Sequence, residues 1–260
     1  MRKSFVKCAT AALLIATVAM TLAGCDKLKQ VKEPEIGVIT TEKNNAIVDE
    51  ASSQDNPPVV QEGLPDAPTG DSTIVWLGDS LTQGSLGHDR DNIANAPYIK
   101  LAALSGRIVE GYGYYGYNTH DIFWVYVDEN HENQKKDPNK TYVFWVGSND
   151  WVIDGNSNDN AQQVIDEIDS FVSQGGITKY LVLSTTARYE LRADYPSNGG
   201  KDMHQLINDK LQEHYGEKYL DVNSVIGLDD GYGPDNIHLT QKSYDDVAKL
   251  VDEKIRQMGW

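Results

Sequence analysis

Short apolar runs alternate with amphipathic stretches along most of the chain. Within each run, consecutive positions are apolar, which is typical of parallel strands buried on both faces of a sheet. The runs predict five strands: 73–78 (TIVWLG), 107–113 (RIVEGYG), 141–147 (TYVFWVG), 179–186 (KYLVLSTT) and the shorter 218–222 (KYLDV).

The stretches between these runs have the periodicity of helices. The clearest has one apolar face and stops at a pair of glycines, as helices often do. That face consists of Ala161, Val164, Ile165, Ile168, Phe171 and Val172. Further helices are predicted after Asn118, over residues 202–215 and from residue 240 onward. The alternation predicts an α/β domain with helices on both faces of a parallel sheet.

The N-terminal segment has a different pattern. A basic start is followed by an apolar stretch up to Leu22 and then by small residues. This is the layout of a secretory signal peptide, too short and wrongly flanked for a membrane span. Residues 22–25 (LAGC) resemble the lipobox of bacterial lipoproteins, whose cysteine is lipidated and becomes the first residue after cleavage. The resemblance implies a signal peptide over 1–24 and a lipid on Cys25, holding the protein on the extracytoplasmic face of the cell membrane. An ordinary secretory signal with an incidental Cys25 is the alternative.

The segment after the signal peptide predicts a linker. Residues 25–70 carry five of the nine prolines and little periodic hydrophobicity. Such a composition is typical of a disordered tether, here with a mean span on the order of 35 to 40 Å. The remaining residues, 71–260, have the size of one domain.

Cysteine content and charge limit the partners of this domain. The only cysteines are Cys8 and Cys25, so the domain has no disulfide and no thiolate site. The net charge of −16 becomes −19 once the three basic residues of 1–24 are removed. A chain this acidic lacks the electrostatic footprint of a nucleic-acid-binding protein, and anionic lipid headgroups repel it. We therefore expect no nucleic-acid partner, and a membrane contact made by the lipid alone.

Polar segments follow four of the five predicted strands. In parallel α/β sheets, ligands bind beyond the carboxyl ends of the strands. The segments are GDS (78–80), GYGYYGYNT (111–119), GSND (147–150) and DNIH (235–238). Taken alone, GDS is well explained by a turn in which Asp79 or Ser80 caps a helix. The meeting of four such segments at one edge of the sheet favours an active site with Ser80 as its nucleophile.

A serine nucleophile needs a histidine base, and the histidine needs a carboxylate that orients it. His238 is preferred because Pro234 and nearby glycines keep its segment out of regular helix. Asp235, three residues earlier, can then fold back onto Nδ1 and leave Nε2 facing Ser80. His120, after the second glycine-rich turn, is the competitor. His204 and His214 lie in a predicted helix and are expected to be solvated surface residues. In isolation, a turn with Asp235 as a helix cap and His238 exposed explains the segment equally well.

Acyl transfer also needs hydrogen-bond donors for the developing oxyanion. The backbone N–H of Ser80 offers one donor, and the carboxamide of Asn149 offers another. Gly116 offers a backbone N–H in a turn where a side chain is expected to crowd the ligand. In the absence of a site, Gly116 is a loop glycine with positive φ and Asn149 is a strand-end turn residue.

The segments GDSLTQG, the glycine of GYNT, GSND and DNIHLT, in this order, resemble the four signature blocks of the SGNH (GDSL-type) hydrolase family. The resemblance implies a flavodoxin-like, three-layer α/β/α fold with a five-stranded parallel sheet, and an esterase, lipase, thioesterase or carbohydrate deacetylase without metal or cofactor. It implies Ser80 as nucleophile, His238 as general acid–base and Asp235 as its orienter. Ser80, Gly116 and Asn149 would form the oxyanion hole. The tyrosine-rich run before Gly116 departs from the family, where many members have an asparagine shortly before this glycine.

One acidic segment mimics a metal site. Residues 154–158 (DGNSN) resemble the start of a calcium loop, but Asp159 stands where the loop needs glycine and Ile165 where it needs glutamate. We expect no metal and no cofactor.

Aromatic residues are frequent around the predicted site. Phe123, Trp124 and Trp145 are expected to pack in the core. Tyrosines beside the glycines are expected to form a platform for a sugar ring or a wall for an acyl chain. The candidate substrate contacts are Asp79, Tyr115, Tyr117, Trp151 and Arg188.

The predicted function is hydrolysis of an acyl ester, foremost an acetyl ester, of a carbohydrate or other small extracellular molecule. The reaction would use a Ser-His-Asp triad and an acyl-enzyme. The acidic surface and the lack of a long apolar loop argue against a lipase at a lipid interface. An acyltransferase with the same triad, a lipase or thioesterase, and a non-catalytic glycan-binding surface module are the alternatives.

Overall fold

The structure, a computed structural model, describes residues 37–39, 73–87, 93–128, 134–150, 157–187, 197–198 and 201–260. The chain divides into two compact units, Met1–Glu33 and Pro34–Trp260, and all of the described residues belong to the second unit. The predicted lipidation site Cys25 and the predicted substrate contacts Trp151 and Arg188 lie outside the described residues.

One large sheet has the strand order β1-β3-β2-β4-β5-β8. Its strands are β1 (Gly37–Ile39), β2 (Ile74–Gly78), β3 (Val109–Gly113), β4 (Thr141–Trp145), β5 (Tyr180–Leu183) and β8 (Tyr219–Leu220). The last five pair in parallel. Numbered along the chain, these five have the order 2-1-3-4-5, which is that of flavodoxin-like folds. The predicted five-stranded parallel sheet is confirmed.

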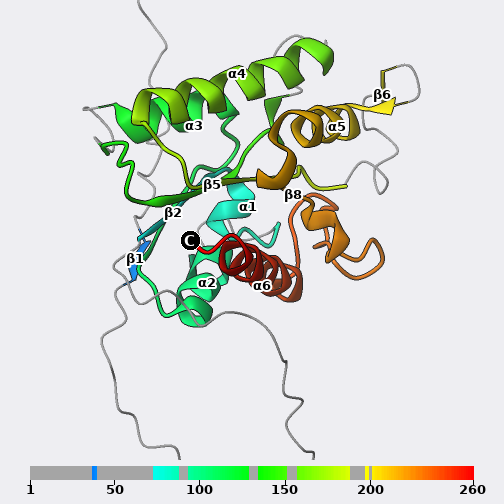
Figure 1. Cartoon of the computed structure of the whole chain (residues 1–260). Coiled ribbons are helices and arrows are strands. Elements are labelled where there is room, and N and C mark those ends of the chain that lie inside the picture. Colours follow the sequence, from blue (N-terminus) through cyan, green and yellow to red (C-terminus); the bar gives the residue numbers. More distant parts are fainter. Residues whose placement is uncertain are drawn as a thin grey trace, which may run out of the picture. The chain divides into compact units, whose positions relative to one another are not determined.

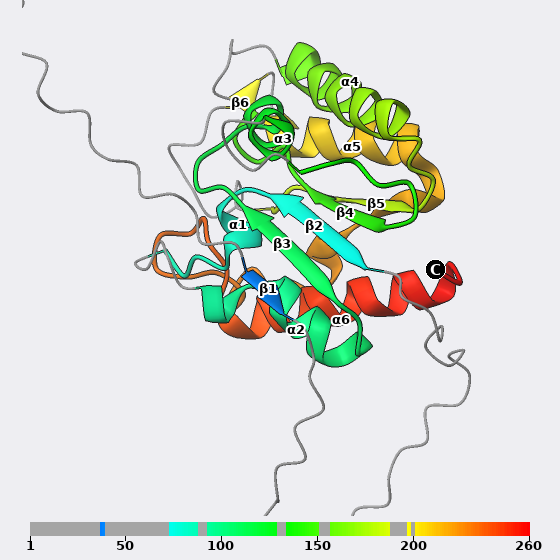
Figure 2. The same cartoon turned by 90° about the vertical axis from the view of Figure 1, so that its left-hand side faces the viewer.

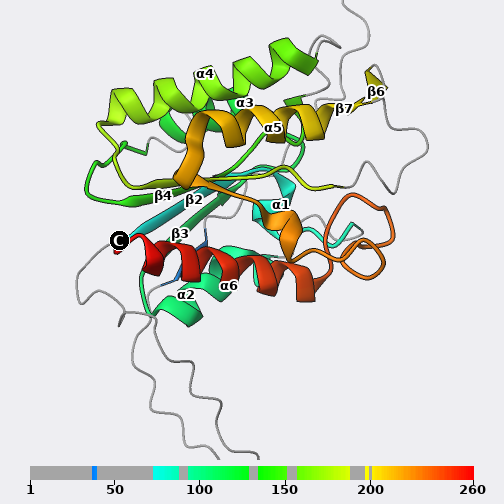
Figure 3. The same ribbon diagram turned by 45° about the vertical axis from the view of Figure 1, so that its right-hand side comes forward.

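Helices cover both faces of this sheet. They are α1 (Ser80–Gln83), α2 (Pro97–Ser105), α3 (Thr119–Val127), α4 (Ser157–Gly175), α5 (Met203–Tyr215) and α6 (Gln241–Gln257). Helices α3, α4 and α5 lie on one face, and α2 and α6 lie on the other (Figure 1). Figure 2 and Figure 3 show the same three layers from two further directions. A short hairpin of β6 (Ser197–Asn198) and β7 (Lys201–Asp202) precedes α5.

Strand β1 comes from the segment predicted as a tether. It pairs antiparallel with the outer side of β3, with Val38 opposite Glu110. The domain boundary predicted at residue 71 therefore misses this edge strand. For the other residues of 25–70, the tether stays a prediction.

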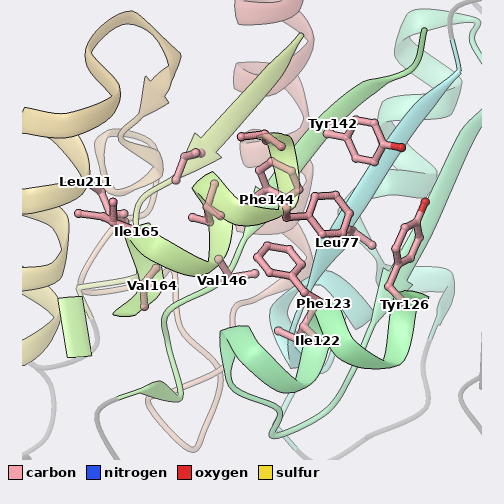
Figure 4. Close-up of a cluster of buried hydrophobic side chains, with 14 of the residues drawn as sticks. Leu77, Ile122, Phe123, Tyr126, Tyr142, Phe144, Val146, Val164, Ile165 and Leu211 are labelled. Carbon is pink, nitrogen blue, oxygen red and sulfur yellow. The ribbon is translucent and has the colours of Figure 1, made fainter. Parts of the chain in front are cut away.

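The two apolar cores follow from the alternation of side chains along each strand. On β4, Tyr142 and Phe144 point to the side of α3 and α4, while Val143 and Trp145 point to the side of α2 and α6. In the first core, Phe171 of α4 stacks on Phe123, with ring centroids 4.6 Å apart. Figure 4 shows Phe123 beside Phe144 in this core.

Two predictions about burial are wrong because a helix has distinct faces. Trp124 was expected in the core, but it is 48 % exposed. It lies on the outer stripe of α3, since residues spaced as His120, Trp124 and Val127 share one side of a helix. Conversely, the sequence predicts a solvated His204, whereas this residue is buried on the inner face of α5.

Helix α2 was not predicted from the sequence. This helix has proline at its first position and ends at Gly106, which has a φ of 68°.

Within the described residues, no helix is long and apolar enough to cross a membrane.

Candidate active site

The strand end at GDS has a specific backbone requirement. A Cβ on Gly78 would lie 2.2 Å from Thr82 Oγ1 and 2.4 Å from the carbonyl oxygen of Trp145, so only glycine fits there. Next, Asp79 caps α1, its Oδ1 accepting a hydrogen bond from Leu81 N at 2.9 Å. Ser80 is the first residue of that helix. The helix-cap interpretation is therefore correct for Asp79, and the same cap fixes Ser80 at the tip of the strand.

Ser80, His238 and Asp235 form one hydrogen-bonded chain. His238 Nε2 lies 2.9 Å from Ser80 Oγ, and His238 Nδ1 lies 2.6 Å from Asp235 Oδ2. An ionised carboxylate only accepts hydrogen bonds, so Nδ1 carries the proton and donates a hydrogen bond to Asp235 Oδ2. Nε2 is then left to accept the hydrogen bond from the Ser80 hydroxyl. Asp235 and His238 share one loop, and Ser80 lies 158 positions before His238 in the sequence.

The loop that holds the histidine is ordered by its own hydrogen bonds. Asp235 Oδ1 accepts from the backbone N–H groups of Ile237 and His238, both at 3.0 Å. Gly233 N donates to the carbonyl oxygen of His238 at 2.7 Å. Asn236 takes the left-handed conformation, with a φ of 54°, which asparagine tolerates better than most residues. Asp235 thus fixes both the loop backbone and the imidazole.

These contacts also set the charge of Asp235. Burial alone would raise its pKa, but the hydrogen bonds from the His238 side chain and from the backbone N–H groups of His238 and Ile237 outweigh burial. The pKa of Asp235 therefore lies below its ordinary value. Asp235 stays an anion that can stabilise an imidazolium.

Gly87 is a partner of Asp235 that the sequence did not reveal. A Cβ at this position would lie 2.8 to 2.9 Å from the carboxyl atoms of Asp235. Gly87 also has a φ of 89°, where side chains are strained. Only the folded structure brings residue 87 next to residue 235, so no local signal in the sequence marks it.

The glycine-rich segment after β3 forms a tight turn. Tyr117 N donates to the carbonyl oxygen of Tyr114 at 3.2 Å, and Gly116 has a φ of 81°. Positive φ at the third residue is the requirement of a type II turn. The sequence predicts that a side chain at Gly116 would be crowded. In the structure, a Cβ there would meet no atom within 4 Å, so the backbone conformation is the reason for this glycine.

Asn149 is held against the same turn. Its Nδ2 donates a hydrogen bond to the carbonyl oxygen of Tyr117 at 2.9 Å. The amide nitrogen carries a second N–H, which is the donor an oxyanion would use. Gly116 and Asn149 follow β3 and β4, the two strands that flank β2, so both lie beside the strand that leads to Ser80.

Asp150, next to Asn149, is a second carboxylate at this edge. It is fully buried and accepts hydrogen bonds from the backbone N–H and the hydroxyl of Thr119, at the start of α3. Burial raises the pKa of Asp150 to about 6, although the hydrogen bonds from Thr119 oppose the shift. The negative charges of Asp79 and Glu167 raise it further. No pattern in the sequence indicates this role of Asp150.

The remaining predicted site residues separate into two groups. Tyr115 and Tyr117 lie in the turn beside His238, and both are half-buried. Asp79 was predicted to contact substrate, but it is 1 % exposed and caps α1 instead. The competitor His120 bonds to Glu167 on α4, at 2.8 Å, and not to Ser80. Within the described residues, no three His, Cys, Asp or Glu side chains gather as metal ligands.

No protein-family model and no curated protein matches the chain. Solved structures do. A lipase/acylhydrolase from Enterococcus faecalis is 19 % identical, with a TM-score of 0.52, over 72 % of this chain and 96 % of that one. A member of the lipolytic protein G-D-S-L family from Veillonella parvula DSM 2008 is 18 % identical, with a TM-score of 0.51, over 69 % and 96 %. The chain shares the fold of these lipolytic proteins.

Another neighbour has the same fold with a further domain. It is a carbohydrate esterase family 2 enzyme plus carbohydrate binding domain from Corynascus thermopiles (Myceliophthora fergusii). It is 13 % identical, with a TM-score of 0.56, and the match covers 75 % of this chain and 69 % of that one. Identities this low establish the common fold, while the roles of individual residues depend on the geometry described above.

Proposed function

We propose that the protein is an SGNH-type serine esterase that removes an acyl group, foremost acetyl, from a carbohydrate or other small extracellular ester. The observation that carries the proposal is the unbroken chain from Ser80 Oγ through the His238 imidazole to Asp235, at 2.9 and 2.6 Å. Serine, histidine and aspartate in this order and at these distances are the arrangement that activates a serine hydroxyl.

In the proposed acylation step, His238 Nε2 takes the proton of the Ser80 hydroxyl while Oγ attacks the ester carbonyl. The carbonyl oxygen becomes an oxyanion, which would accept hydrogen bonds from the N–H groups of Ser80 and Gly116 and from Asn149 Nδ2. His238 then returns the proton to the departing alcohol, and an acyl-enzyme remains. Asp235 accepts the Nδ1–H bond and stabilises the imidazolium during both transfers.

Deacylation repeats these roles with water. His238 Nε2 takes a proton from the water molecule, whose oxygen attacks the acyl carbon. Collapse of the second oxyanion expels Ser80 Oγ, which recovers its proton from His238. The products are the free acid and the resting enzyme.

The substrate class rests on two supports. Tyr117 is a half-buried tyrosine of the turn beside the proposed triad, and aromatic side chains of this kind suit sugar rings. One structural neighbour is described as a carbohydrate esterase and another as a lipase/acylhydrolase. We therefore propose acetylated sugars as the first substrates to test, with short-chain and long-chain esters beside them.

The test of the activity compares the chain from residue 26 onward with its Ser80→Ala variant. This length retains β1, which a start at residue 71 would remove from the sheet. We expect turnover of 4-nitrophenyl acetate that falls about 10⁵- to 10⁶-fold, to the background rate, in Ser80→Ala. Unchanged turnover in that variant would refute the serine mechanism. Products formed with an acceptor alcohol present would separate a hydrolase from an acyltransferase.

We also propose that Cys25 carries the lipid that places the enzyme on the extracytoplasmic face of the membrane. The support is the LAGC sequence at the end of the apolar stretch. When the full chain is expressed in a bacterium fed labelled palmitate, the label and the membrane association should both disappear in Cys25→Ala. Membrane association that persists without the label would refute the proposed anchor.

A further inference from the structure

The imidazole of His238 is contacted on its face as well as on its two nitrogens. The ring of Tyr115 stacks on it, with centroids 5.4 Å apart and planes 23° apart. Asp235 fixes the Nδ1 edge of the imidazole and Ser80 meets the Nε2 edge. Hydrogen bonds at two edges still allow the ring to tilt about the line between them. A stacked ring on one face opposes that tilt.

Tyr115 is itself rigidly placed. It occupies the second position of the type II turn, whose Tyr117 N–H donates to the carbonyl oxygen of Tyr114. Tyr114 N donates to the carbonyl oxygen of Gly78 at 2.9 Å, so a backbone hydrogen bond joins the turn to the end of β2, two residues before Ser80. The rings of Tyr114 and Tyr117 stack on each other, with centroids 5.7 Å apart. Tyr115 is thus the one ring of these three that faces the histidine.

The same turn also carries parts of the proposed oxyanion hole. Gly116, the residue after Tyr115, would supply a backbone N–H, and the carbonyl oxygen of Tyr117 holds Asn149 Nδ2 at 2.9 Å. The turn of residues 114–117 therefore contacts His238 through Tyr115, contains the N–H of Gly116 and holds the Asn149 side chain. A shift of this turn would move all of them together.

The electronic character of the stack suits the reaction. In both transition states His238 becomes a cation, and the face of an aromatic ring attracts a cation by its quadrupole. Burial of the histidine strengthens this attraction, since little water competes with it. The ring of Tyr115, rather than its hydroxyl, is the part that provides it.

We propose that Tyr115 is a positioning residue for His238: its ring holds the imidazole toward Ser80 and stabilises the imidazolium that forms during acyl transfer. The proposal rests on the proposed esterase function. It differs from the role predicted from the sequence, in which Tyr115 contacts the substrate. The two roles separate when esters share the acyl group and differ in the alcohol.

The experiment measures kcat and KM for Tyr115→Leu and Tyr115→Phe with 4-nitrophenyl acetate and with glucose pentaacetate. Tyr115→Leu removes the ring and keeps an apolar side chain, so we expect kcat to fall roughly 3- to 30-fold on both esters, with KM for the nitrophenyl ester little changed. Tyr115→Phe keeps the ring, so its kcat should stay within about twofold of that of the unmodified chain.

The matched control is Tyr180→Leu. Tyr180 is a half-buried tyrosine at the amino end of β5, at the opposite edge of the sheet from Ser80, where its ring lies under the Lys218 ammonium. The same chemical change there should lower the melting temperature without changing kcat. If Tyr115→Leu does not fold, Tyr115→Met removes the ring with a more flexible side chain and takes its place.

Three outcomes would overturn the proposal. Tyr115→Leu with an unchanged kcat would show that the stack is only packing. A loss confined to the sugar ester would show that Tyr115 contacts substrate. A loss in Tyr115→Phe as large as in Tyr115→Leu would assign the effect to the hydroxyl. The esterase function is judged separately by Ser80→Ala, which tests the nucleophile whatever Tyr115 does.

Discussion

Asp235 and Asp150 lie at the same edge of the sheet, but their surroundings shift their pKa values in opposite directions. Asp235, whose side chain is 28 % exposed, accepts hydrogen bonds from the imidazole and from two backbone N–H groups. These bonds hold its pKa below the ordinary value despite partial burial. Asp150 is fully buried, and among the described residues its side chain accepts hydrogen bonds from Thr119 alone; burial raises its pKa to about 6.

The difference shows that the number of hydrogen-bond donors and the remaining hydration decide whether the pKa of a carboxylate is lowered or raised. Asp235 is built to remain charged and to face a cation, which is a catalytic requirement. Burial of Asp150 disfavours its charged form, so ionisation of this group lowers the stability of the fold. Its hydrogen bonds join the start of α3 to the segment that follows β4. The four predictions below test this contrast, beginning with the largest effect.

Asp235→Asn should abolish most of the activity. An amide facing Nδ1 can donate a hydrogen bond, which favours the tautomer with the proton on Nε2, and that tautomer cannot accept the proton of Ser80. We expect kcat for 4-nitrophenyl acetate to fall about 10³- to 10⁴-fold. The matched control is Asp150→Asn, for which kcat should remain within about tenfold of the unmodified chain. Similar losses in the two variants would remove the contrast between the aspartates.

Gly87→Ala should displace Asp235 without changing its chemistry. The new Cβ would lie within 2.9 Å of the carboxyl group, so the carboxylate must shift. Displacements of this kind cost about 10- to 100-fold in kcat. Gly106→Ala is the control, because Gly106 also has a positive φ, 68°, but an added Cβ there meets no atom within 4 Å. Equal activity of the two alanine variants would show that Asp235 tolerates the displacement.

Asp150→Asn should change how stability depends on pH. The pKa of Asp150 is raised from 3.8 to about 6 in the folded protein, so the folded state holds this proton more tightly than the unfolded state does. The free energy of unfolding therefore falls as pH rises through this window, by about 3 kcal/mol from this group alone. Asparagine does not ionise, so Asp150→Asn lacks this fall in the free energy of unfolding.

Urea titrations at pH 4 and pH 7 measure the effect. The stability of Asp150→Asn relative to the unmodified chain should rise by about 2 kcal/mol between the two pH values, because the carboxyl of the unfolded chain is already partly ionised at pH 4. Asp235 acts with the opposite sign, because its lowered pKa gives stability that is lost as pH falls through the folded pKa. Asp235 is present in both proteins, so its contribution to the free energy of unfolding cancels in this comparison. A pH-independent difference would mean that Asp150 is not held protonated by burial.

Thr119→Val should have the smallest effect. It removes the hydroxyl that donates to Asp150 Oδ2 at 2.9 Å and leaves the backbone donor in place. Since that hydroxyl favours the charged form, its loss should raise the pKa of Asp150 further and cost about 1.5 to 3 kcal/mol at pH 8. In the Asp150→Asn background the same substitution should cost less at pH 8, and equal costs in both backgrounds would contradict a charge-assisted bond.

Local patterns in the sequence were sufficient for much of the fold. Consecutive apolar positions marked β2, β3, β4 and β5, and helical periodicity marked α4 and α6, because these long segments each bury a continuous face. The pattern was insufficient for Trp124, because α3 carries large apolar residues, Trp124 and Val127, on its exposed face as well as on its buried face. It was also insufficient for β1, three residues that become a strand only when the edge of β3 is present.

The candidate site shows the same division. The types and order of Ser80, Asn149, Asp235 and His238 could be recognised from the sequence, because each stands in a short segment at a strand end. The sequence also offered two explanations for GDS, and the structure combines them: Asp79 caps the helix and Ser80 meets the histidine. Gly87 could not be recognised, since its partner Asp235 is distant along the chain.

By itself, the sequence determined the alternation of strands and helices, the acidic character and the chemical groups available at one edge of the sheet. Only the tertiary structure decided the strand order, the tyrosine that covers the histidine and the opposite pKa shifts of the two aspartates. The physical reason is that periodicity and residue type act between near neighbours. Desolvation, ring stacking and hydrogen bonds between loops depend on groups that folding brings together from distant parts of the chain.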